Sequence, residues 1–234
     1  MQRYLRSTEV IDWTHPEVLA HARVLAAGSD DRSVVARRCF EWVRDEIRHT
    51  RDHRLPSVTC AASEVLRLRS GYCYAKSHLL AALLRANGTP AGLCYQRLSR
   101  DGQGPPFCLH GLNAVYLPDV GWYRVDPRGN RAGVDAQFIP PAERLPFVPS
   151  LPGEADLPGV FADPLPAVVE ALRSHVSADE LWELLPDVAL WRNGMPRTEQ
   201  NARSHARDSV GRSSEFSSIR TRHGRLKTTR VEHP

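Results

Sequence analysis

Residues 70–88, SGYCYAKSHLLAALLRANG, constrain this chain more than any other part of its sequence. Beyond the cysteine, apolar residues recur at the spacing of a helix face, and Gly-Thr-Pro at 88–90 predicts that the helix ends near Asn87. At the other end, Gly71 interrupts regular structure two residues before Cys73. The thiol is therefore expected in the first helical turn, where free backbone N–H groups and the helix dipole lower a cysteine's pKa. This placement makes Cys73 a candidate nucleophile.

Helices are expected first along the chain and strands afterwards. The apolar periodicity predicts helices over residues 16–27, 31–48, 59–68 and 73–87. After the Gly-Thr-Pro stop the pattern becomes extended, with strands expected over 91–98, 110–117 and 122–126. Helices followed by hairpin-connected strands are typical of an α+β protein, so we expect the Cys73 helix to pack on an antiparallel sheet.

The length suits one domain with a sizeable core. We expect that domain over residues 1–196, with its core at about 30–130 and a proline-rich wrap with short helices over 135–196. Residues 197–234 carry nine Arg or Lys against four acidic residues, whereas the rest of the chain is nearly neutral. Such a segment buries too little apolar surface to order itself, so we interpret it as a disordered tail. Contact of the tail with nucleic acid is the alternative, although Phe216 is its only aromatic residue.

Three features bear on the compartment in which the chain works. It contains no run of eighteen apolar residues, so no membrane span is expected. Residues 1–9 lack the apolar core of a secretory signal. The five cysteines form an odd set, which fits free thiols in a reducing compartment better than disulfides. We therefore expect a cytoplasmic protein.

A nucleophilic cysteine needs a base, and the base needs an orienting group. His110 starts one predicted strand and Asp126 ends the next. Because side chains alternate along a strand, these two share a face only if the residues paired across the strands have numbers that sum to an even value. A three-residue loop that pairs Leu117 with Gly121 meets this condition, and glycine suits the left-handed position that ends such loops. We predict this register, with Cys73, His110 and Asp126 as catalytic residues.

Three blocks of sequence carry a resemblance to a known family. They cover residues 71–91, 110–116 and 121–130, and they present Cys, His and Asp in that order on a helix, a strand and a strand. With these blocks the chain resembles the core of the bacterial transglutaminase-like superfamily over about residues 30–130. The last hundred residues add nothing to the resemblance.

The resemblance implies a papain-like α+β fold with a Cys-His-Asp triad. In this interpretation Cys73 attacks a carbonyl carbon, His110 is general base and then acid, and Asp126 orients the imidazole. The substrates implied are amides, either peptide bonds or glutamine side chains, and the acyl-enzyme passes to an amine or to water. The Cys73 backbone N–H is one expected oxyanion donor, and the sequence assigns no second donor. We expect no metal and no cofactor.

Three alternatives stay open at this point. Cys73, Cys108 and His110 could together bind zinc, although a fourth ligand is missing. The chain could instead be a catalytically idle member of the same fold that binds a peptide or a partner. Residues 69–71, Arg-Ser-Gly, also resemble the Arg-Gly-Gly that precedes the cysteine of arylamine N-acetyltransferases, whose acyl donor is a thioester.

Overall fold

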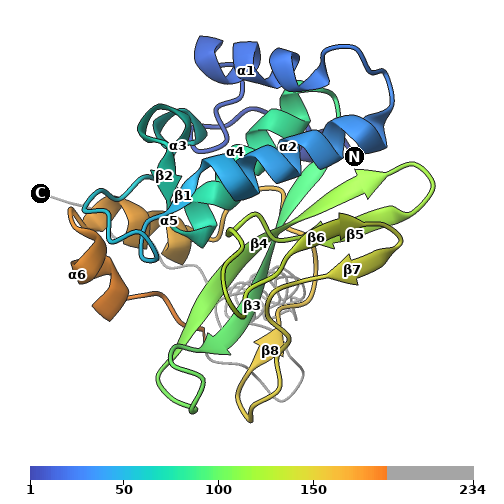
Figure 1. Cartoon of the computed structure of the whole chain (residues 1–234). Helices are drawn as coiled ribbons and strands as arrows, with labels where there is room; N and C mark the ends of the chain where they lie inside the picture. The colour runs from blue at the N-terminus through green and yellow to red at the C-terminus, as the bar shows by residue number, and fades with distance from the viewer. Residues whose placement is uncertain (189–234) are drawn as a thin grey trace, which may run out of the picture. The chain divides into compact units, whose positions relative to one another are not determined.

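The computed structural model describes residues 1–188 of the chain (Figure 1). The predicted basic tail over 197–234 and the last residues of the predicted proline-rich wrap lie outside this range. The single domain over 1–196 therefore stays a prediction.

The helix that Cys73 begins lies at the centre of the fold. The helices of the first half are α1 (Pro16–Ala26), α2 (Arg32–Glu46), α3 (Ala62–Leu68) and α4 (Cys73–Ala86). α4 packs against the other three helices and against the sheet (Figure 1). Its residues from Cys73 to Arg85 are all buried, because the sequence there is apolar almost all round and not on one stripe alone.

The main sheet has four antiparallel strands in the order β5-β4-β3-β8. They are β3 (Ala91–Ser99), β4 (Phe107–Leu117), β5 (Gly121–Val125) and β8 (Ala155–Asp156). A parallel pair, β1 (Arg48–His49) and β2 (Ser70–Gly71), leads into α4, and a hairpin of β6 (Gln137–Ile139) and β7 (Ala142–Arg144) lies beside β5. The predicted α+β class, with helices first and an antiparallel sheet after them, is confirmed.

The turn between β4 and β5 has the predicted register. Leu117 pairs with Gly121 across a three-residue loop, and Gly121 has a φ of 83°. A positive φ of this size is readily adopted by glycine and disfavoured for other residues, which explains why a glycine closes this loop.

The segment predicted as a proline-rich wrap does more than cover the body of the protein. It forms β6 and β7, and its Ala155–Asp156 adds a short strand to the edge of β3. Two short helices follow, α5 (Pro166–Ser174) and α6 (Ala178–Glu183). Strands of two or three residues are too short to show an alternating pattern, so the sequence did not reveal them. Within residues 1–188, no helix has both the length and the apolar character needed to cross a membrane.

Candidate active site

Cys73 is the first residue of α4, as the sequence predicted, and is 7% exposed. The residues on either side of it are tied to other parts of the chain. The Tyr72 hydroxyl donates to the carbonyl oxygen of Ala178 (2.6 Å), and the Tyr74 hydroxyl donates to that of Leu109 on β4. These two bonds hold the first turn of α4 in place, so the thiol has a defined position.

A glycine lets this turn approach the sheet closely. A Cβ atom at Gly111 would lie 2.9 Å from Tyr74 Cδ1 and 3.2 Å from Tyr74 Cα, so no larger residue fits without movement. Gly111 follows His110 directly along β4. The missing side chain therefore sets the separation between the thiol of α4 and the imidazole of β4.

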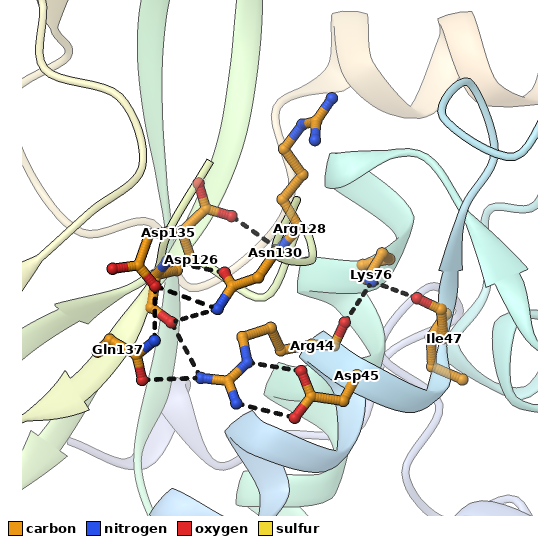
Figure 2. Close-up of polar contacts among 10 residues, drawn as sticks. Arg44, Asp45, Ile47, Lys76, Asp126, Arg128, Asn130, Asp135 and Gln137 are labelled. Atoms are coloured by element: carbon orange, nitrogen blue, oxygen red, sulfur yellow. Dashed lines mark hydrogen bonds and ion pairs between the residues drawn. The ribbon is translucent and has the colours of Figure 1, made fainter. Parts of the chain in front are cut away.

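His110 and Asp126 meet beyond the paired part of β4 and β5, which ends at Asn113 and Val125. His110 Nε2 lies 2.6 Å from Asp126 Oδ2, and the carboxylate is 1% exposed. Its other oxygen, Oδ1, accepts from the backbone N–H of Arg128 (2.9 Å; Figure 2). Both carboxylate oxygens are thus occupied, which fixes the orientation of Asp126.

The charge state of His110 follows from its two neighbours. Burial alone would lower the pKa of His110, but the hydrogen-bonded Asp126 carboxylate and the neighbouring Cys73 sulfur together raise this pKa to about 10. Because Nε2 faces Asp126, Nδ1 is the nitrogen left for the thiol. The structure therefore brings all three predicted residues together, with the imidazole between sulfur and carboxylate.

A cavity of about 660 Å³ opens over Cys73 and His110. Its walls are largely apolar or aromatic, and Phe147 packs edge-on against the His110 ring with the ring centres 5.0 Å apart. Cys108 also lines this cavity, and burial followed by the charge of Cys73 raises the pKa of the Cys108 thiol to about 12. Among residues 1–188, no group of three or more His, Cys, Asp or Glu side chains is placed to hold a metal ion.

A second group of polar residues supports the site, and sequence reasoning missed it. Arg128 donates two hydrogen bonds to the Asp52 carboxylate (2.7 and 3.0 Å), and Asp52 Oδ2 lies 3.6 Å from His49 Nδ1. His49 lines the same cavity as Cys73. The available signal was the His-Thr-Arg-Asp sequence at 49–52, directly after a predicted helix, in a stretch that resembles an ordinary polar loop.

Lys76, one turn after Cys73, is the other unexpected residue. Its side chain is fully buried, and Nζ donates to the carbonyl oxygens of Ile47 and Arg44 at the end of α2 (Figure 2). Burial lowers the pKa of Lys76 to about 7, although the Asp126 carboxylate opposes that shift. Lys76 thereby links α4 to the end of α2 and places an amine near Asp126.

Fold and site together define a class: an α+β protein with a buried cysteine, histidine and aspartate on a helix, a strand and the end of a strand. Residues 20–127 match the model of the transglutaminase-like superfamily. This part of the chain is therefore a transglutaminase-like core, and the resemblance predicted from the three sequence blocks is confirmed. No protein with a curated description matches the chain in sequence.

Several solved structures are similar to part of the chain. One is a candidate cysteine protease from Cytophaga hutchinsonii, with 17% identity over 53% of this chain and 40% of that one, at a TM-score of 0.44. Another is the periplasmic domain of TgpA from Pseudomonas aeruginosa, with 23% identity over 54% of this chain and 46% of that one, at a TM-score of 0.40. The matched region spans less than half the length of either structure.

Proposed function

We propose that this protein is a cysteine-dependent amide hydrolase or acyltransferase of the transglutaminase-like superfamily. The observation that carries the proposal is the 2.6 Å contact between His110 Nε2 and Asp126 Oδ2, with the Cys73 sulfur close enough to the same imidazole to raise its pKa. An imidazole held by a carboxylate on one side and a thiol on the other is the arrangement that nucleophilic acyl transfer requires.

The reaction runs in two stages. The Cys73 sulfur attacks the carbonyl carbon of an amide, the C–N bond breaks, and His110 gives its proton to the leaving nitrogen. A thioester on Cys73 remains. Water or an amine then attacks this thioester, His110 accepts the proton of the attacking group, and the sulfur leaves. Asp126 stabilises the imidazolium in both stages without itself becoming protonated.

The cavity favours substrates that carry an amide among apolar groups. Tyr72, Phe147 and Trp182 contribute aromatic walls. Most of the charged side chains that line the cavity are paired within the protein, as Arg51 is with Asp179 (3.0 Å) and Arg128 is with Asp52 (2.7 Å). Such a site offers apolar contact near the thiol and little uncompensated charge, which fits a peptide or a glutamine side chain better than a highly charged substrate.

The test follows the acyl group. The wild type is mixed with p-nitrophenyl acetate, and we expect a burst of nitrophenol together with an acetyl group on Cys73 in the mass spectrum. Cys73→Ala should abolish both. Peptides that contain glutamine, supplied with and without a primary amine, then distinguish transfer from hydrolysis by the product formed. A wild type that is never acylated on Cys73 would refute the proposal and leave an idle binding protein.

A second assay tests a thioester as the alternative acyl donor. Acetyl-CoA with an aromatic amine should give no acetylated amine above the level of Cys73→Ala. If the wild type forms more acetylated amine than Cys73→Ala, the protein is a thioester-dependent N-acyltransferase, and the amide-based proposal is wrong.

A further inference from the structure

The proposed reaction forms a tetrahedral intermediate whose oxyanion needs at least two hydrogen-bond donors. The backbone N–H of Cys73 at the start of α4 is one of them. A second donor has to lie beside that helix start. His49 fits this requirement, because β1 pairs in parallel with β2, which places His49 next to Gly71, and the N–H of Thr50 donates to the Gly71 carbonyl (3.1 Å).

His49 is held firmly in that place. It is 6% exposed, it lines the cavity over Cys73, and its ring packs edge-on against Tyr72 with the ring centres 5.7 Å apart. A buried imidazole costs free energy unless its nitrogens find partners. Yet His49 Nδ1 makes no hydrogen bond, and the triad does not use this side chain.

The groups around His49 keep its imidazole neutral. Burial, and then the positive charges of Arg128, Lys76, His110 and Arg131, lower the pKa of His49 well below its usual range. The imidazole is therefore neutral at neutral pH and carries one N–H. The neighbouring Asp52 carboxylate accepts from Arg128 with both oxygens, and its Oδ2 lies 3.6 Å from His49 Nδ1, so no hydrogen bond fixes that proton on Nδ1.

We propose that His49 is the second oxyanion donor of the site, giving a hydrogen bond from Nε2 to the carbonyl oxygen of a substrate bound at Cys73. This inference rests on the function proposed above.

The test compares two reactions of the same sulfur. Acylation by p-nitrophenyl acetate passes through a tetrahedral oxyanion, whereas alkylation by iodoacetamide displaces iodide and forms none. His49→Phe keeps a ring against Tyr72 and removes the donor. We expect it to slow acylation of Cys73 about a hundredfold, the usual effect of losing one such donor, and to leave the alkylation rate within about twofold of the wild type.

Two further variants sharpen the comparison. His49→Gln restores an N–H donor of similar reach, so it should recover a substantial part of the acylation rate. His53→Phe removes an exposed histidine four residues further along the chain and should change neither reaction. The alkylation rate also reports whether each variant retains its folded site.

The outcomes separate this inference from the function on which it rests. If the wild type is alkylated but never acylated, the proposed function fails and the role of His49 fails with it. If the wild type is acylated and His49→Phe reacts equally fast, only the role of His49 is wrong. A variant slowed equally in both reactions would mean that His49 positions Cys73 and does not contact the oxyanion.

Discussion

Gly111→Ala tests how the fold sets the distance between nucleophile and base. The backbone of Gly111 has an ordinary conformation, so an alanine causes no dihedral strain and acts only through its Cβ. That atom would lie 2.9 Å from Tyr74 Cδ1 and 3.2 Å from Tyr74 Cα. The Tyr74 ring is buried, and its hydroxyl is bonded to Leu109, so the ring has no free direction in which to turn away. The first turn of α4 must therefore move.

The size of that movement follows from ordinary contact distances. Carbon atoms pack comfortably at about 3.5–4.0 Å, so relief of both contacts needs a displacement of about half an ångström. Overpacking of this kind costs about 1–3 kcal/mol of the free energy of unfolding. A misplacement of about 1 Å costs roughly a hundredfold in rate, so half of it should slow acylation of Cys73 by about tenfold.

The assay measures Cys73 acylation and urea unfolding on Gly111→Ala and on a matched control. Gly92→Ala on β3 is also crowded, because its Cβ would meet Val160 Cγ1, but Gly92 lies away from the cavity. Gly92→Ala should lower the free energy of unfolding, but its folded molecules should acylate Cys73 at the wild-type rate. A Gly111→Ala protein with the wild-type rate, or one slowed only in proportion to its unfolded fraction, would refute the reasoning.

Three other changes address the charges around the site. Asp126→Asn removes the carboxylate that raises the pKa of His110 to about 10, so alkylation of the thiol at neutral pH should slow about tenfold or more. The raised pKa of His110 stabilises the folded wild type fully below about pH 6.5, and this stabilisation is lost as the pH rises to about 10. The free energy of unfolding of Asp126→Asn, measured by urea titration, should therefore fall less than that of the wild type over this pH range. An equal fall in the two proteins would contradict this assignment. Burial lowers the pKa of His78 to about 4, whereas the histidine of the unfolded chain takes up its proton near pH 6.5. As the pH falls from about 6.5 to 4, His78→Leu should therefore lose less free energy of unfolding than the wild type. An equal loss in the two proteins would contradict this expectation. Arg128→Lys keeps the charge but cannot make both bonds to Asp52, so chemical unfolding should show a loss of about 1–3 kcal/mol, and no loss would mean that this pair contributes nothing to stability.

The sequence by itself determined the class of fold and the three residues that meet in the site. The apolar period after Cys73 and the glycine before it were enough to place the thiol at a helix start, because both signals lie within one helix length. The register of β4 and β5 followed from strand alternation and one turn glycine, Gly121, so the shared face of His110 and Asp126 was predictable. Each of these is a local rule of backbone geometry.

The tertiary structure alone decided what surrounds those residues. Asp52 and Arg128 lie 76 positions apart, and no periodicity links them. In the sequence, Lys76 is one polar residue in an apolar helix. Only the tertiary structure places the end of α2 beside its ammonium group. In the sequence, His49 resembles a histidine of a polar loop. The short parallel pairing with Gly71 in the tertiary structure brings it to the start of α4. Contacts of this kind depend on how separate elements pack, and packing is a property of the assembled core that no local stretch of sequence encodes.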